Sequence, residues 1–194
     1  MASVYYFPMV HVLSPESIDD EVNESIKNVN SVLRQDLDFV ERFNEELKKD
    51  YPQINTCWYN FLDFLKDNNS FNKVYMEGMV GREVGCQLDQ SGSGMSDCIN
   101  YLSDSGAVFE KTESELLLNL TWKVRRNKLL FNQSNKLREA YLGHRIDSTL
   151  EFNDQALLLY GAKHKKGITN LLSYHQIPFE VHENINWPSE YLFN

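Results

Sequence analysis

At 194 residues the chain is long enough for one domain with a sizeable core, and its 42% hydrophobic content favours a folded globule over a disordered chain. The formal net charge of −9 disfavours sequence-independent binding to nucleic acid, which needs a basic surface, and electrostatic docking onto anionic lipid. We therefore expect neither nucleic acid nor a membrane as a partner.

The amino-terminal residues carry neither a basic segment nor a long apolar run, so we expect no signal peptide. No apolar run reaches the roughly 20 residues that a membrane-spanning helix needs. The three cysteines, Cys57, Cys86 and Cys98, are an odd number without paired metal-ligand spacing, which argues against a disulfide framework. These features favour a reducing compartment, and we expect a cytoplasmic location.

An apolar, strand-like run over 4–10 opens the chain and ends at His11. The sequence Ser14-Pro15-Glu16 then supplies a hydroxyl cap, a proline and an acid, a combination that begins many helices. Apolar residues recur at three- and four-residue steps over 18–33, which predicts an amphipathic helix from 15 to 33.

Two more helical stretches follow. Apolar residues over 37–47 predict a helix that Pro52 interrupts, because proline lacks the amide hydrogen that a helix interior requires. The aromatic stretch 58–65 predicts a separate helix that ends in a turn. A short strand over 73–76 comes next and ends at Glu77.

The glycine-rich segment 78–95 predicts a mobile loop near the end of that strand, and we expect it to act as a lid. Its glycines do not match a phosphate-binding loop, because the closing lysine and hydroxyl are absent. A short helix around 98–102 and a strand over 107–109 follow. The stretch 112–142 predicts a mostly helical segment.

The last unit is a strand over 156–160, a helix around 168–172 and a strand over 179–181. The alternation of strands and helices predicts an α/β fold, a layered α/β/α arrangement whose central sheet is mostly parallel or mixed and has helices on both faces. We expect a single domain over 1–183 and leave the tail 184–194 unassigned.

Three side chains share one kind of position: His11, Glu77 and His164 each follow an apolar strand. If these strands are parallel neighbours, their carboxyl ends meet at one edge of the sheet, which is where open α/β sheets build their sites. Two imidazoles and a carboxylate can hold a divalent metal such as Mn²⁺, Co²⁺ or Zn²⁺ with positions open for water or substrate. The sequence therefore predicts a metal site formed by His11, Glu77 and His164.

Such a site would activate a water molecule for hydrolysis. Glu77 would serve either as a metal ligand or as the general base while the two histidines hold the metal. Arg126 would stabilise an oxyanion or orient Glu77, although it lies in a basic run where a solvated helix face is the ordinary outcome and Arg125 is an equal candidate. Asn127 would hold a ligand or a substrate carbonyl.

Several of these residues also resemble a family pattern. Gly161-Ala162-Lys163-His164 resembles the carboxy-terminal GxxH motif of the TraB/PrgY/GumN family, which includes the TIKI-type metalloproteases. Arg126-Asn127, Glu77-Gly78 and His11 resemble its Arg-Asn pair, its strand-end glutamate and its first motif histidine, in the same order. Pro8 stands where the first GxxH motif has glycine. The resemblance covers most of the chain and implies a TraB-like metal-dependent hydrolase or peptidase.

The same fold group contains erythromycin-esterase-like and ChaN-like proteins, and the ChaN branch binds haem. A second hypothesis is therefore a non-catalytic or regulatory protein that binds haem or a small molecule, in place of an enzyme acting on a peptide or small-molecule substrate. A third is an interaction module in which acidic amphipathic helices over 15–50 pack on a partner or on a second copy in a homo-oligomer. His144, which follows Gly143, could belong to the site, but we expect a structural or solvent-exposed role for it. His175 and His182 are expected at the surface.

Overall fold

The computed structural model describes residues 2–9, 34–68, 70–81, 93–124, 127–183 and 185. Its centre is a five-stranded sheet in the order β3-β2-β4-β1-β5, and every neighbouring pair is parallel. The strands are β1 (Ser3–Met9), β2 (Lys73–Met76), β3 (Val108–Glu110), β4 (Gln155–Gly161) and β5 (Phe179–Val181). The predicted α/β fold is therefore confirmed, with a wholly parallel sheet.

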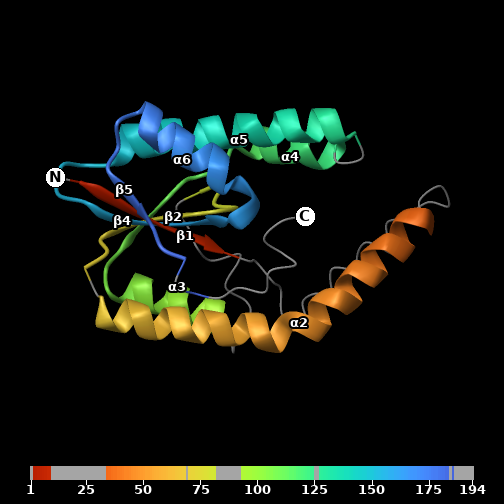
Figure 1. Ribbon diagram of the computed structural model, residues 1–194, viewed down its shortest axis with the longest axis horizontal. Helices are drawn as coiled ribbons and strands as arrows, with labels where there is room; N and C mark the ends of the chain where they lie inside the picture. Colours follow the sequence, from red (N-terminus) through yellow and green to blue (C-terminus); the bar gives the residue numbers. More distant parts are fainter. Residues whose placement is uncertain are drawn as a thin grey trace.

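Helices cover both faces of this sheet (Figure 1). The helices α2 (Arg34–Asp67) and α3 (Gly94–Asp104) lie on one face. The opposite face carries α4 (Glu115–Val124), α5 (Lys128–Thr149) and α6 (Lys165–Tyr174), and the 3₁₀ turn η2 (Ala162–His164) joins β4 to α6. No helix in the described ranges is both long and apolar enough to cross a bilayer. The predicted helix 15–33 lies outside the described residues.

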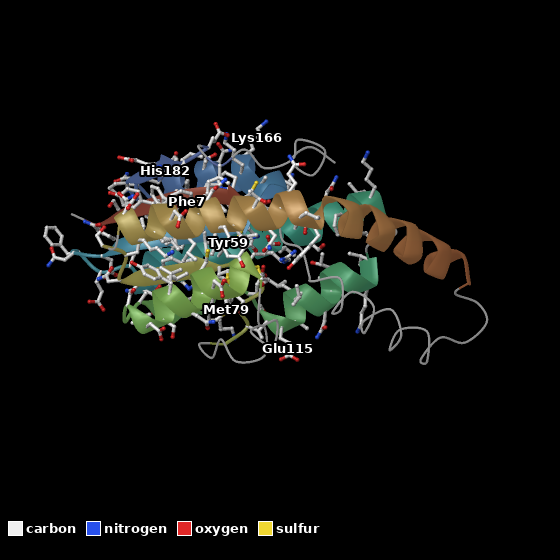
Figure 2. All side chains as sticks on the ribbon, turned by 90° about the horizontal axis from the view of Figure 1, so that it is seen from below. Phe7, Tyr59, Met79, Glu115, Lys166 and His182 are labelled. Carbon is white, nitrogen blue, oxygen red and sulfur yellow. The ribbon has the colours of Figure 1, made fainter. Side chains whose placement is uncertain are left out.

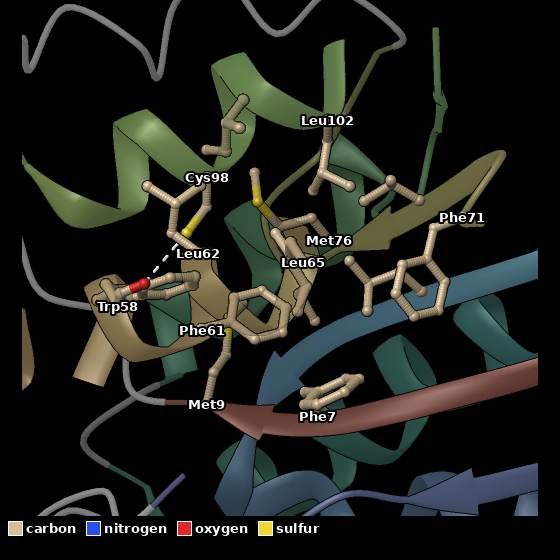
Figure 3. Packing of buried hydrophobic residues seen from close by; sticks show 14 of the residues in the cluster. Phe7, Met9, Trp58, Phe61, Leu62, Leu65, Phe71, Met76, Cys98 and Leu102 are labelled. Atoms are coloured by element: carbon tan, nitrogen blue, oxygen red, sulfur yellow. Dashed lines mark hydrogen bonds between the residues drawn. The ribbon is translucent and has the colours of Figure 1, made fainter. Parts of the chain in front are cut away.

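Each face of the sheet has its own apolar core. In β4, alternate side chains point to opposite faces, so Leu157 and Leu159 join the core under α2 and α3 while Leu158 joins the other. Because both faces are buried, the strand is a continuous apolar run. The first core is rich in aromatic side chains (Figure 3), where the buried thiol of Cys98 donates to the carbonyl oxygen of Trp58 at 3.3 Å.

The expectation that Pro52 separates two helices was wrong. One helix, α2, runs through Pro52 from Arg34 to Asp67, and it is bent (Figure 1). A proline inside a helix removes one backbone hydrogen bond and kinks the chain, but it need not end the helix when packing holds the flanks. After Pro52 the helix is held by buried Ile54, Trp58 and Phe61, and Thr56 donates its hydroxyl to the Pro52 carbonyl at 2.8 Å.

The helical segment predicted over 112–142 is two helices, α4 and α5. The break lies at Asn127, whose side-chain oxygen accepts a hydrogen bond from the Leu130 amide at 3.1 Å and so caps α5. Asparagine favours this role because its short side chain reaches the unpaired amides of the first turn. The segment therefore folds as an antiparallel hairpin.

The three strands that precede His11, Glu77 and His164 are neighbours, as the sequence predicts. In the sheet β4 lies between β1 and β2, with Met9 paired to Gly161 and Met76 paired to Leu159. All three strands are parallel, so their carboxyl ends share one edge. This edge is where the candidate site must be sought.

Candidate functional site

Two of the three predicted metal ligands meet at the carboxyl edge. Glu77 follows β2, and its side-chain Oε2 accepts a hydrogen bond from the Gly161 amide at the end of β4 (2.7 Å). His164 ends the η2 turn, and its Nε2 lies 3.7 Å from Oε1 of Glu77. His11 lies outside the described residues. The structure thus brings the predicted carboxylate and one predicted imidazole together.

The segment from Gly161 to Gly167 has a glycine on each side of His164, and both glycines make room for a carboxylate. A Cβ atom at Gly161 would lie 2.7 Å from Oε2 of Glu77. A Cβ atom at Gly167 would lie 1.9 Å from Oε2 of Glu139, a residue of α5. Any side chain at either position would displace the carboxylate beside it. The close approach explains why glycine stands three residues before and three residues after His164.

His164 is 2% exposed and held in a defined orientation. Its Nδ1 lies 2.7 Å from Oε1 of Glu139, and its ring meets the ring of Tyr160 edge-on at 5.2 Å. When Nδ1 carries the proton and donates it to Glu139, the Nε2 of a neutral ring presents a lone pair. That buried Nε2 has no hydrogen-bond partner among the described residues. In that tautomer, the nitrogen that carries the lone pair lies 3.7 Å from Oε1 of Glu77.

Arg138 of α5 connects the partly buried Glu77 to a fully buried carboxylate, that of Glu113. It binds Glu113 through two hydrogen bonds, Nε to Oε2 at 3.0 Å and Nη2 to Oε1 at 2.5 Å, and its Nη2 also contacts Oε1 of Glu77 at 3.1 Å. Burial lowers the pKa of Arg138, but the hydrogen bonds and charges of its partners outweigh burial and raise that pKa. The guanidinium remains charged and orients both carboxylates.

Glu113 is fully buried and also accepts a hydrogen bond from the Tyr160 hydroxyl. Burial and the nearby carboxylates raise the pKa of Tyr160, which keeps the phenol neutral and able to donate. The turn after β2 fixes the backbone here, because the carbonyl oxygen of Met79 accepts from the amides of Thr112 and Glu113, each at 2.9 Å.

The turn at Gly78 and Met79 bears on the expected lid over 78–95. Gly78 has a positive φ of 87°, which suits glycine, and the Met79 side chain is buried. These first residues of the segment are therefore part of the framework that positions Glu113. Residues 82–92 lie outside the described residues.

Among the described residues, Arg138 is the arginine that contacts Glu77, a role that the sequence assigned to Arg126. Arg126 and its alternative Arg125 lie outside the described residues. Asn127, expected beside the site, is exposed and has its side-chain oxygen on the Leu130 amide, so it acts as a helix cap. The sequence signal that could have identified Arg138 is its spacing from the other buried residues of α5. Positions 134, 138, 142 and 146 recur every four residues and form the buried stripe of α5, so Arg138 is a charge where an apolar side chain is expected.

The remaining histidines are mostly peripheral. His144 is exposed, as expected, and His175 is partly exposed. His182 was expected at the surface but is partly buried, because its ring stacks on Phe7 at a centroid distance of 4.7 Å (Figure 2). Its amide donates to the Tyr6 carbonyl at 2.8 Å, which brings the residue after β5 over the aromatic core.

The side chains at this edge fit a divalent metal as part of its ligand set. Two ligands with bonds near 2 Å at a tetrahedral angle lie roughly 3.3 Å apart, close to the 3.7 Å between His164 and Glu77. The Glu139–His164 contact is the carboxylate–histidine arrangement that orients metal-binding imidazoles. Within the described ranges no three histidine, cysteine or acidic side chains form a complete metal-binding group. A full site needs a further ligand, the role predicted for His11.

Comparisons with protein-family models, with curated proteins and with solved structures find no match to this chain.

Proposed function

We propose that the chain is a metal-dependent hydrolase in which His164, Glu77 and His11 hold one divalent cation at the carboxyl edge of the sheet. The observation that supports this most is the buried Nε2 of His164, which has no partner in the described part of the chain and faces a carboxylate at 3.7 Å. A lone pair that faces a partly buried carboxylate is unfavourable unless a proton or a cation lies between them. A cation at that point would relieve the repulsion and bind both groups.

The charge of the cluster supports the same proposal. Among the described side chains of this cluster, Arg138 contacts the carboxylates of Glu77 and Glu113, and the Glu139 carboxylate contacts His164. These contacts join three carboxylates with one guanidinium. Buried carboxylates in excess over cations are costly. A divalent cation beside His164 would offset the excess.

The chain's own residues have separate roles in this proposal. Glu139 holds the imidazole of His164 in the tautomer that leaves Nε2 available, and Arg138 with the Gly161 amide fixes the Glu77 carboxylate. A bound divalent metal would lower the pKa of its water and polarise a carbonyl group. Glu77 would act either as a ligand or as the base that takes a proton from that water.

The residues of the proposed site include those that resemble motifs of the TraB/PrgY/GumN family. The glycine and the histidine of the GxxH motif meet at Glu77, since Gly161 accommodates its carboxylate and His164 faces it. The family resemblance favours peptide bonds as the substrate, with esters as the chemically similar alternative. Arg138 makes a contact with Glu77 of the kind that we expected from Arg126.

Calorimetric titration of Mn²⁺, Co²⁺ and Zn²⁺ into metal-stripped protein tests the proposal. We expect binding near one equivalent that is abolished by His164→Ala and by His11→Ala. Replacement of the exposed His144 by alanine is the matched control and should leave binding unchanged. Loss of binding in all three variants would point to non-specific coordination, and absence of binding by the unaltered protein would refute the metal site.

A second candidate is a protein that binds haem or another small molecule without turnover. The observation that favours it is the contact of Arg138 with Glu77, since a carboxylate that already binds a guanidinium is a weaker metal ligand. This candidate predicts that the metal-stripped protein binds no divalent metal but shifts the absorption spectrum of added haem. It also predicts that His164→Ala abolishes that spectral shift.

A further inference from the structure

The hairpin of α4 and α5 carries leucines that no core uses. Leu116 is 77% exposed and Leu129 is 67% exposed, and three more leucines of the hairpin are exposed: Leu120, Leu130 and Leu137. Leu116 and Leu120 are one turn apart on α4, so they lie on one face of that helix. Grouped exposed apolar side chains of this size mark interaction surfaces more often than chance.

The same hairpin is basic, although the chain as a whole is acidic. Residues 116–138 contain six of the 19 lysines and arginines and none of the 28 acidic residues. Arg138 is engaged in the buried cluster, while Lys123, Lys128 and Lys136 are exposed. The hairpin therefore presents exposed leucines together with positive charge, and a partner should offer apolar side chains together with acids.

The chain itself contains a segment of that composition. The first part of α2, residues 34–50, extends away from the sheet and from α3 in two perpendicular views (Figures 1 and 2), and we call it the arm. The arm contains six acidic and four basic residues, and five of the acids lie within 36–46. Its apolar residues recur at three- and four-residue steps: Leu37, Val40, Phe43 and Leu47. Seventeen helical residues span about 26 Å, enough to lie along either helix of the hairpin.

We propose that the arm of one copy docks on the α4–α5 hairpin of a second copy, and that the second copy returns the same contact. Within one copy the arm and the hairpin lie apart in Figure 1, so we place the contact between two copies. A two-fold axis would make both contacts equivalent and close the assembly as a dimer. The acids of the arm lie against the lysines of the hairpin, and the apolar residues of both are removed from water.

A charge exchange tests this arrangement. Lys123→Glu with Lys128→Glu reverses the charge at two positions of the hairpin. Glu41→Lys with Glu45→Lys does the same in the arm. Sedimentation equilibrium should give about twice the 22.7 kDa chain mass for the unaltered protein. The dissociation constant of the dimer should be at least tenfold larger for each reversed variant. An equimolar mixture of the two variants should form a one-to-one heterodimer, because each reversed surface then meets its opposite.

Lys66→Glu with Lys166→Glu is the matched control, since it makes the same change in net charge at exposed positions outside both surfaces and should remain dimeric. Circular dichroism of every variant verifies the fold. A monomeric unaltered protein, or reversed variants that fail to pair when mixed, would overturn the proposal. Binding of a monomeric protein to phosphatidylserine vesicles would overturn it too and assign the hairpin to anionic lipid.

Discussion

A polar cluster lies at each end of the parallel strands, one at their amino ends and one at their carboxyl ends. The two clusters differ in how completely their charges and hydrogen-bonding groups are paired. At the amino edge, Lys73 binds the Asp154 carboxylate at 2.5 Å and also donates to the Thr149 carbonyl. Asp154 accepts further bonds from Asn72 at 3.0 Å and from the Glu151 amide at 2.7 Å. One cation meets one anion, and the donors of the cluster find acceptors. Such a cluster fixes the start of β2 beside the start of β4.

At the carboxyl edge the described side chains place two carboxylates on the Arg138 guanidinium and a third, that of Glu139, on His164, whose buried Nε2 has no hydrogen bond among the described residues. Folding tolerates this arrangement only at some cost, because unsatisfied buried polar groups are unfavourable. The paired groups of the amino-edge cluster stabilise the fold, whereas the acid-rich cluster is the place where we propose that a cation binds.

The largest expected effect comes from Arg138→Met, which removes the only described cation of the carboxyl cluster. Glu113 is fully buried, so the loss should lower the free energy of unfolding by about 3–5 kcal/mol. Urea denaturation measures it, with the exposed Lys136→Met on the same helix as a control expected within about 0.5 kcal/mol of the unaltered protein. Adding Glu113→Gln to Arg138→Met should restore part of the loss. Equal effects of Arg138→Met and Lys136→Met would contradict the role given to Arg138.

Asp154→Asn tests the balanced cluster, and its effect should depend on pH. Burial alone would raise the pKa of Asp154, but hydrogen bonds from Lys73, the Glu151 amide and Asn72 outweigh burial and hold the pKa below its usual value. The carboxylate therefore stabilises the fold fully above its unfolded pKa of about 3.9 and loses that contribution as pH falls through the lower folded pKa.

We expect Asp154→Asn to lower the free energy of unfolding by about 2 kcal/mol at pH 7. The difference from the unaltered protein should shrink as the pH falls below about 4 and nearly vanish once the folded carboxyl group is protonated. Urea denaturation at a series of pH values measures the difference. A gap that stays constant down to the acid limit would show that Asp154 is not held ionised by its partners.

The smallest expected effect on stability comes from Gly167→Ala, which should disturb the proposed metal site and leave the fold intact. Gly167→Ala would push the Glu139 carboxylate away from His164, since the new Cβ would lie 1.9 Å from Oε2 of Glu139. Gly143→Ala is the matched control, because its Cβ would make only ordinary contacts of 3.5 Å and longer with Leu171. Both helical replacements should leave stability within about 1 kcal/mol of the unaltered protein.

Only Gly167→Ala should weaken metal binding, by about tenfold, because the carboxylate that orients His164 has moved. In metal-free protein, the ¹⁵N shifts of the His164 ring should change in Gly167→Ala and stay the same in Gly143→Ala. Identical ring shifts in both variants would mean that the Glu139 contact does not set the state of the imidazole.

Sequence reasoning located the strand-end residues because their signal is local. Glu77 and Gly161 each follow an apolar run, and neighbouring parallel strands bring such ends together. Arg138 and Glu139 lie within α5, and which helical residues reach the sheet edge depends on how α5 packs on β4. The stripe of Leu142 and Ile146 was legible in the sequence, but its continuation through a charged residue was not recognised.

Glu113 and Pro52 show two further features that sequence patterns alone did not predict. Glu113 lies three residues past β3, and its burial depends on the Met79 turn, a contact between segments more than 30 residues apart. Pro52 is an ordinary helix breaker, yet α2 continues through it because the residues that follow are anchored in the aromatic core. Both outcomes are set by tertiary packing, which local patterns do not contain.

The most direct test of the central claim is a crystal structure of the zinc-loaded protein with anomalous diffraction at the zinc edge. We predict an anomalous peak at roughly 2.0–2.2 Å from Nε2 of His164 and from a carboxylate oxygen of Glu77. Nδ1 of His164 should keep its hydrogen bond to Glu139. An ordered His164 whose Nε2 donates directly to Glu77, with the zinc peak elsewhere, would contradict this prediction.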